Sequence, residues 1–246
     1  MNDSATGGPK VALVTGANRG IGFEIARQLA QQGVTVLLGA RNQAAGDEAA
    51  SRLAAEGLDV IGQQIDVSNA ASISAAAQDI ESRFGKLDIL VNNAGISIEK
   101  GVAPSDADIE LMRQTYETNV FGPVAVIQAM LPLLRKSPAG RIVNMSTGLA
   151  SLALTSGPDA PMHRMQLLSY NSSKTALNAV TVQFANELFD TPIKVNSANP
   201  GLCATELSSG KGRPPADGAT VAVRLALLDS DGPTGGMFGE EGQTPW

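Results

Sequence analysis

The chain of 246 residues contains very little cysteine, histidine or aromatic side chain, and each shortage excludes a class of structure. A single cysteine, Cys203, excludes an internal disulfide, which is typical of a protein of the reducing cytoplasm. A single histidine, His163, beside that single cysteine argues against most metal sites and against hydrolases with a histidine base. We therefore expect no metal and a cytoplasmic location, with Cys203 as a small buried filler and His163 as a loop residue.

Positive charge is also scarce, because 18 Lys and Arg stand against 24 Asp and Glu and leave a net charge of -6. This balance gives no electrostatic footprint for nucleic acid or acidic membranes. No uninterrupted apolar run approaches the length of a membrane span, and the opening MNDSATGGPK has no apolar signal core. We expect neither nucleic acid nor a membrane as a partner, and a disordered lead over residues 1–9.

Aliphatic residues are abundant, since 43% of the chain is apolar while only 4% is aromatic. A parallel sheet that is buried on both faces needs such a core. Apolar runs of strand length alternate with stretches of helical period. Strands are expected at 10–16, 35–41, 60–67, 87–95, 141–148, 193–201 and, as a short seventh, 235–242. Helices are expected at 20–32, 42–56, 69–84, 105–136 (one long helix or two abutting helices), 169–189 and 216–228.

This alternation predicts an α/β fold with a single Rossmann-type, doubly wound parallel sheet and helices on both faces. We expect about seven strands in the order 3-2-1-4-5-6-7, within one catalytic domain over residues 10–246. Gly33 and Gly57 mark helix ends, and Ser68 is the expected cap at the start of the third helix. Two stretches break the alternation: residues 148–168, an expected insertion, and residues 203–218, whose glycines and prolines suit a lid over a substrate.

The first strand runs directly into TGANRGIG, residues 15–22, at the start of the next helix. Gly16, Gly20 and Gly22 allow a tight turn, so that backbone N–H groups and the helix dipole can approach a pyrophosphate. The spacing G-x-x-x-G-x-G differs from the usual dinucleotide fingerprint. A purely structural turn is the alternative, but the place of the cluster in the first βαβ unit favours a dinucleotide.

The second strand ends without the carboxylate that would bind the ribose hydroxyls of NAD. Ala40 stands in that place and is followed by Arg41, while Arg19 lies beside the glycines. Two guanidinium groups could converge on a 2'-phosphate, each charge-assisted bond contributing roughly 1.5 to 3 kcal/mol. We therefore predict NADP(H) as the cofactor.

The segment SYNSSKTAL places Tyr170 and Lys174 four residues apart, on one face of the expected helix. A unit charge at about 4 Å in a dielectric of 20 contributes roughly 4 kcal/mol, enough to bring the pKa of a phenol near neutrality. The alternative is a solvated pair on a surface helix.

The chain resembles the short-chain dehydrogenase/reductase family from Lys10 to about Gly242. Besides TGANRGIG, the shared motifs are the DV of residues 66–67, NNAG at 92–95, Asn119, Ser146, YNSSK at 170–174 and NPGLCAT at 199–205. Their order and their positions at strand ends carry the resemblance. The stretches LLGARN, EGLDVIGQQIDV and LALLDSDGPTGGMF are similar to the carbonyl-reductase-like branch.

The resemblance implies a role for each matching residue. Tyr170 would be the general acid in ketone reduction, Ser146 would hold the substrate oxygen, Lys174 would bind the nicotinamide ribose, and Asn119 would position a relay water. Asn92 is either structural or part of the site. The cofactor would be held by Gly16, Asn18, Arg19, Gly20, Ile21, Gly22, Arg41, Asp66, Val67, Asn93, Ala94, Gly95, Tyr170, Lys174, Pro200, Gly201 and Thr205.

The segment between Ser146 and Tyr170 is longer than most of the family needs, and in the branch that the chain resembles a longer insertion accompanies a monomer. A monomer is therefore favoured, with a homo-oligomer as the alternative. The expected pocket walls are mostly apolar or small, which predicts a neutral, hydrophobic ketone or aldehyde as the small-molecule substrate. Rival functions are physiological oxidation of an alcohol, a non-catalytic NADP-binding sensor, and a methyltransferase, which would not need Tyr170, Lys174 and Ser146 together.

Overall fold

The computed structural model describes residues 9–99 and 101–246; the expected lead over residues 1–9 lies, except for Pro9, outside this part of the chain. One sheet forms the centre, in the order β3-β2-β1-β4-β5-β6-β7-β8. Its strands are β1 (Val11–Val14), β2 (Thr35–Ala40), β3 (Val60–Gln64), β4 (Ile89–Asn92), β5 (Arg141–Met145), β6 (Lys194–Ala198), β7 (Met237–Gly239) and β8 (Gly242–Thr244). The first seven pair in parallel, which confirms the predicted class and order, and β8 adds an antiparallel hairpin strand at the edge.

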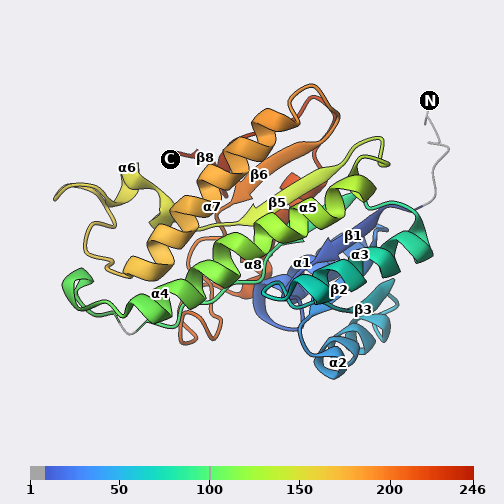
Figure 1. Ribbon diagram of the computed structural model, residues 1–246, viewed down its shortest axis with the longest axis horizontal. Helices are drawn as coiled ribbons and strands as arrows, with labels where there is room; N and C mark the ends of the chain where they lie inside the picture. Colours follow the sequence, from blue (N-terminus) through green and yellow to red (C-terminus); the bar gives the residue numbers. More distant parts are fainter. Residues whose placement is uncertain (1–8, 100) are drawn as a thin grey trace.

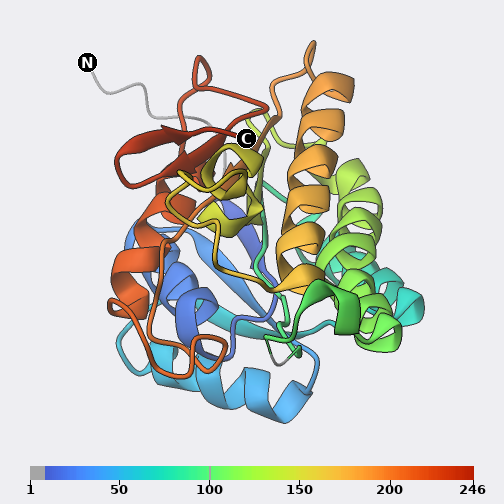
Figure 2. The same ribbon diagram turned by 90° about the vertical axis from the view of Figure 1, so that its left-hand side faces the viewer.

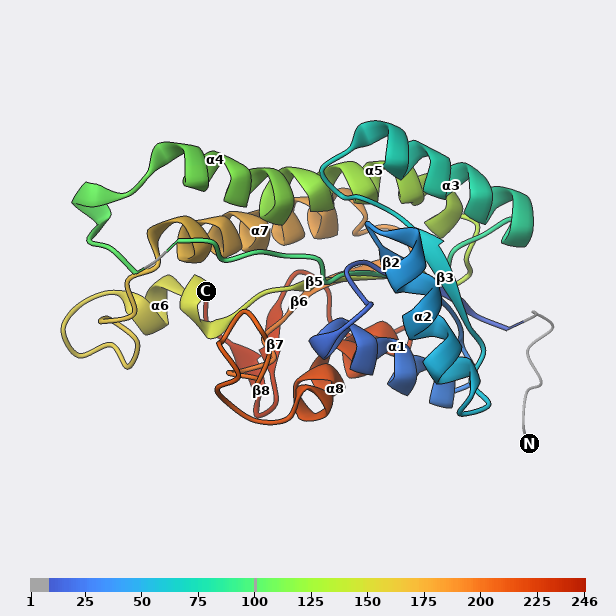
Figure 3. The same cartoon turned by 90° about the horizontal axis from the view of Figure 1, so that it is seen from below.

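Helices cover both faces of the sheet, as Figures 1 and 3 show. One layer contains α1 (Gly20–Gln31), α2 (Gln43–Ala54) and α8 (Pro215–Ala226). The other contains α3 (Ala70–Phe84), α4 (Ile109–Tyr116), α5 (Gly122–Leu134) and α7 (Leu168–Glu187). Figure 2 shows the same three layers from the side. Each strand alternates its side chains between the two layers, so Ala12 and Val14 pack on the α1 side while Val11 and Leu13 pack on the α3 side.

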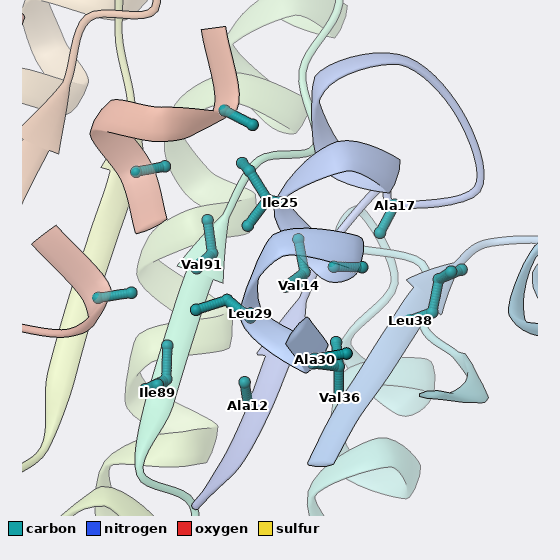
Figure 4. Close-up of a cluster of buried hydrophobic side chains, with 14 of the residues drawn as sticks. Ala12, Val14, Ala17, Ile25, Leu29, Ala30, Val36, Leu38, Ile89 and Val91 are labelled. Atoms are coloured by element: carbon teal, nitrogen blue, oxygen red, sulfur yellow. The ribbon is translucent and has the colours of Figure 1, made fainter. Parts of the chain in front are cut away.

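The core on the α1 side is built from small and branched aliphatic side chains. Figure 4 shows Ile25, Leu29 and Ala30 of α1 packed onto residues of β1, β2 and β4. Leu29 and Val36 are fully buried. Burying such a side chain contributes roughly 1.5 to 3 kcal/mol, so this aliphatic packing holds the strand ends that carry the site.

Two predicted helix ends are confirmed and one predicted cap is wrong. Gly33 and Gly57 take left-handed conformations, with φ of 76° and 81°. The cap of α3 is Asn69, whose side chain accepts from the N–H of Ser72, and not Ser68. The reason is that α3 begins at Ala70, which puts residue 69 at the N-cap and leaves Ser68 in the turn before it, where its hydroxyl donates to Asp66.

The long helical region predicted at 105–136 begins with a 3-10 turn, η1 (Pro104–Asp106), and continues as one apolar helix over Ile109–Leu134. A π-helical turn, η2 (Glu117–Phe121), separates α4 from α5. By length and composition this helix could cross a membrane, although Glu110, Arg113 and Glu117 interrupt its apolar run. Half of its most apolar window is buried, and α5 packs against the sheet and α3, as a core helix of this fold does.

The predicted insertion forms a 3-10 turn, η3 (Gly148–Ala150), a short helix, α6 (Leu152–Thr155), and a series of turns. In Figures 1 and 3 it lies at one end of the molecule, beside the start of α7. The backbone N–H of Ala153 donates to the carbonyl of Trp246 at 3.0 Å, so the C-terminal residue lies against it.

Candidate active site

The predicted site residues other than Asn119, Tyr170 and Lys174 follow the carboxyl ends of six parallel strands. The order of the sheet reverses between β1 and β4, which is where open α/β sheets bind ligands. The groups gathered at this edge are residues 15–22 after β1, Arg41 after β2, Asp66 and Val67 after β3, Asn93 to Gly95 after β4, Ser146 after β5, and Pro200, Gly201 and Thr205 after β6.

The turn after β1, which also contains Asn18 and Ile21, leaves no room for side chains at Gly16 and Gly22. Gly16 and Gly20 both have a φ of 60°. A Cβ on Gly16 would lie 2.9 Å from Cα of Ala94, and one on Gly22 would lie 2.4 Å from Nδ2 of Asn93. The first turn of α1 carries neither a side-chain cap nor an acidic residue, so its N–H groups are available to an anion. The turn therefore fits the pyrophosphate of a dinucleotide.

The segment after β4 fixes this turn. The side-chain amide of Asn93 donates to the carbonyls of Thr15 and Gly16, at 2.9 and 3.0 Å. In return, the hydroxyl of Thr15 accepts from the backbone N–H groups of Asn93 and Ala94. These bonds between β1 and β4 hold the glycine turn in one shape before any ligand arrives.

The adenosine side contains the predicted acid and both arginines. Asp66 accepts from the hydroxyl and the N–H of Ser68, and these bonds, with the charge of Arg41, hold the pKa of Asp66 below its usual value. Arg41 is exposed at the end of β2. Arg19 forms an ion pair with Glu206 at 2.5 Å, both side chains being mostly exposed. The structure thus places Arg41 beside Asp66, while Arg19 is paired with the segment after β6.

Tyr170 and Lys174 lie on one face of α7, as the spacing predicted. The ammonium of Lys174 is 5.9 Å from the centre of the Tyr170 ring and donates to the carbonyl of Met145 at 2.9 Å. A Cβ on Gly95 would lie 3.2 Å from that ammonium and 3.4 Å from Oδ1 of Asn119. These contacts therefore bring four elements together at one point: the carboxyl ends of β4 and β5, the η2 turn and α7.

The predicted effect of Lys174 on the phenol is wrong in this structure. Burial raises the pKa of Tyr170 to about 12, instead of bringing it toward neutrality. Burial also lowers the pKa of Lys174 to about 8. The estimate from the sequence assumed a charge at about 4 Å and left out desolvation, which disfavours the charged form of both groups. At neutral pH the phenol keeps its proton.

Ser146 lies at the end of β5 and is 4% exposed. Its hydroxyl donates to Oδ1 of Asn178 at 2.7 Å. Asn178 is one further turn along the α7 face that carries Tyr170 and Lys174, and it is also buried. We did not single out Asn178 from the sequence, although its spacing of four residues from Lys174 is a signal that could have found it.

Asn119 lies in the π-helical turn η2 and is fully buried. Its Oδ1 accepts from the N–H of Ile96 at 2.8 Å, and its Nδ2 donates to the carbonyl of Ile96 and to the hydroxyl of Ser173. That hydroxyl donates to the carbonyl of Tyr170 at 2.8 Å. Asn119 thus joins the segment after β4 to the helix that carries Tyr170. π-helical turns of this kind recur at functional sites.

A buried polar chain supports α7 behind these residues. Asn92 donates to Asn144, Asn144 donates to Thr181, and the hydroxyls of Thr181 and Ser197 lie 2.9 Å apart. The first of these bonds ties β4 to β5, so the contacts favour the structural role of Asn92. Because buried polar groups need partners, this chain fixes the helix against the sheet.

The segment after β6 closes the edge of the site. A Cβ on Gly20 would lie 3.4 Å from the methyl group of Thr205, so this segment reaches the glycine turn. Arg213 donates to the carbonyl of Pro200 at 2.7 Å and pairs with Glu240. Cys203 is buried, as expected for a filler, and burial raises the pKa of its thiol.

The insertion borders a groove of about 580 Å³ on a different face of α7. Its lining includes Leu149, Leu152, Met165, Asn171 and Thr175. Asn171 and Thr175 each follow Tyr170 and Lys174 by one residue, so this groove borders the face of α7 next to the one that carries the acid. His163 is exposed in the insertion and contacts the carbonyl of Ala160, as expected for a loop residue.

Comparison with known proteins agrees with this geometry. The family model described as short chain dehydrogenase matches residues 10–215. A short-chain dehydrogenase of Penicillium roqueforti is 38% identical over 227 residues, covering 89% of each chain. Salutaridine reductase from Papaver somniferum superposes with a TM-score of 0.82 at 30% identity, covering 94% of this chain and 100% of that one. NADPH-bound carbonyl reductase from chicken fatty liver gives a TM-score of 0.83 at 25% identity, with 97% and 99% covered. The chain therefore belongs to the short-chain dehydrogenase/reductase family, whose members oxidise or reduce small molecules with nicotinamide cofactors.

Proposed function

We propose that this protein reduces a neutral, mostly hydrophobic ketone or aldehyde to an alcohol with NADPH, as a carbonyl-reductase-like member of its family. The observation that carries the proposal is the convergence of Tyr170, Lys174 and Ser146 beside the glycine turn. A phenol with a pKa of about 12 carries its proton at neutral pH, as a general acid for reduction must.

Each side chain has a distinct task in this proposal. Tyr170 gives its phenolic proton to the oxygen of the substrate, which becomes strongly basic as the carbonyl is reduced. A reduced nicotinamide supplies a hydride when bound. To hold the same oxygen, the hydroxyl of Ser146 turns its single hydrogen from Oδ1 of Asn178 to the substrate. Lys174 contributes a fixed positive charge beside the phenol. Both amide hydrogens of Asn119 are bonded to protein groups. In this proposal Asn119 therefore fixes Ile96 and Ser173, in addition to the expected positioning of a water.

The preference for NADPH rests on the arginines and on the absence of an acid after β2. Arg41 is exposed where the 2'-phosphate of NADP would lie in this fold, and a solved relative at 25% identity is described as bound to NADPH. Arg41→Asp should raise the Michaelis constant for NADPH and lower that for NADH. A wild type without preference for NADPH would refute this part of the proposal.

A neutral substrate is supported by the partners of the nearby cations. Arg213 is held by Pro200 and Glu240, and the guanidinium of Arg164 contacts the ring of His163. Exposed apolar side chains on the surrounding loops include Ile98, Leu202 and Leu207.

The test is turnover of NADPH with a panel of aromatic ketones, comparing wild type with Tyr170→Phe. We expect turnover in the wild type, and in the variant a loss of turnover with NADPH binding intact. Binding without turnover in the wild type would favour the sensor, and turnover only with alcohols and NADP would favour physiological oxidation. Unaffected turnover in Tyr170→Phe would refute the assigned acid.

Three further expectations belong to this proposal. The segment 203–218 acts as a lid, supported by its contacts with Arg19 and Gly20 at the glycine turn. The protein is a monomer, and a tetramer in light scattering at micromolar concentration would be the contrary result. It works in the cytoplasm, the setting predicted from its cysteine content.

A further inference from the structure

The first turn of α7 has no cap of its own. The residue at its N-cap is Leu167, whose side chain cannot accept a hydrogen bond. The first N–H groups of a helix have no partner within the helix, so they need an acceptor from elsewhere. One of these N–H groups belongs to Tyr170, so the anchoring of this turn determines where the phenol lies.

Glu99 supplies the missing acceptors from 70 residues away in the sequence. Its Oε2 accepts from the N–H of Ser169 at 3.0 Å, and its Oε1 accepts from the N–H of Tyr170 at 2.7 Å. Each carboxylate oxygen therefore holds one N–H group. Bonds from N–H to a carboxylate are stronger than those to a neutral acceptor, and a negative charge is favourable at a helix N-terminus.

The peptide groups of Tyr170 are consequently held on both sides. Glu99 binds its N–H, while its carbonyl accepts from Ser173, whose hydroxyl also receives a bond from Asn119. Asn119 in turn binds both backbone groups of Ile96, three residues before Glu99. The segment 96–99, which follows the NNAG motif, is thus fixed to the site at both ends.

We propose that Glu99 is a positioning residue for the reaction, which fixes the backbone of Tyr170 and joins the segment 96–99 to the catalytic helix. The inference rests on the proposed function, since the proton of Tyr170 is the one that has to be placed. A displaced phenol would affect the proton transfer more than the binding of substrate or cofactor. The effect is therefore expected in kcat, with KM for NADPH unchanged.

The test compares Glu99→Ala and Glu99→Gln with the wild type and with a matched control, Asp108→Ala. Asp108 caps α4 through the N–H groups of Glu110 and Leu111, so its loss removes a similar carboxylate cap from a helix without Tyr170. We expect kcat for ketone reduction to fall by about 10- to 100-fold in Glu99→Ala. Glu99→Gln keeps one acceptor oxygen and should fall between Glu99→Ala and the wild type. Asp108→Ala should keep kcat while losing thermal stability comparably.

Amide hydrogen exchange gives a reading that does not depend on turnover. In the wild type and in Asp108→Ala, the N–H groups of Ser169 and Tyr170 should be protected, and in Glu99→Ala they should exchange faster. If the wild type shows no turnover, the proposed function fails. The exchange result still tests whether Glu99 binds the N–H groups of Ser169 and Tyr170. The inference is overturned if Glu99→Ala keeps the kcat of the wild type, or if its loss of kcat is matched by Asp108→Ala.

Discussion

Replacement of Lys174 by methionine is predicted to remove turnover and yet to stabilise the fold at neutral pH. Lys174 is 4% exposed, and burial lowers its pKa from 10.5 to about 8. The unfolded chain keeps the ordinary pKa, so between about pH 8 and 10.5 it binds more protons than the folded chain. The contribution of Lys174 to the free energy of unfolding therefore rises with pH through this window, by about 1.4 kcal/mol between pH 7 and pH 9. The raised pKa of Cys203 acts in the opposite sense and is common to all the variants compared.

The magnitude at pH 7 follows from the same shift. A pKa of about 8 in place of 10.5 means that burial of the charged ammonium destabilises the fold by about 3 kcal/mol. An uncharged methionine at this position has no such desolvation cost. Loss of the bond to the carbonyl of Met145 offsets about 1 to 2 kcal/mol of this gain. We expect Lys174→Met to be more stable than the wild type by about 1 to 2 kcal/mol at pH 7.

The assay is urea unfolding at pH 7 and pH 9, below the range in which Tyr170 begins to titrate in the unfolded chain. Lys136→Met is the control, because Lys136 is half-exposed and paired with Glu81. The control should follow the pH dependence of the wild type. Between pH 7 and pH 9 the wild type should gain about 1.4 kcal/mol relative to Lys174→Met, which lacks the contribution of Lys174. Equal slopes in the wild type and Lys174→Met, or a large loss of stability in that variant, would refute the reasoning.

Three other substitutions test separate parts of the structure. Gly22→Ala should lower the free energy of unfolding by about 1 to 3 kcal/mol, because the new Cβ would clash with Asn93. It should also weaken NADPH binding, measured by fluorescence. Asp88→Ala should lower the free energy of unfolding in urea by about 3 kcal/mol, since buried Asp88 accepts from Val11 and Ser137 and pairs with Lys86. Asn178→Leu should lower kcat about tenfold without changing KM for NADPH, because the hydroxyl of Ser146 loses its fixed partner. Unchanged values in these assays would contradict the corresponding contacts.

The sequence predicted those features that depend on local pattern. Alternating apolar runs gave the sheet and both helix layers, since burial on two faces requires such runs. It missed β8, whose three residues, Gly242–Thr244, have no apolar alternation and pair only because the turn after β7 brings them back. It also placed the α3 cap at Ser68, one residue too early, because the residue at which the helix begins depends on how the chain turns after β3.

The site was predictable where the chemistry lies along one helix or one turn. Tyr170 and Lys174 meet because their spacing matches a helical turn, and the glycine turn follows a strand directly. The direction of the pKa of Tyr170 was not predictable, because desolvation depends on what surrounds the ring. Glu99 was not predictable either, since no local pattern joins it to a helix that begins about 70 residues later.

The most direct test of the account is the ionisation of Tyr170 itself. The chain has only two tyrosines, Tyr116 and Tyr170, so the phenolate absorbance of wild type minus that of Tyr170→Phe isolates one phenol. With the fold verified by circular dichroism, we predict no phenolate from Tyr170 at about pH 10, where an ordinary tyrosine is half ionised. Ionisation of Tyr170 below about pH 9 in the free protein would contradict the claim that burial keeps this acid protonated.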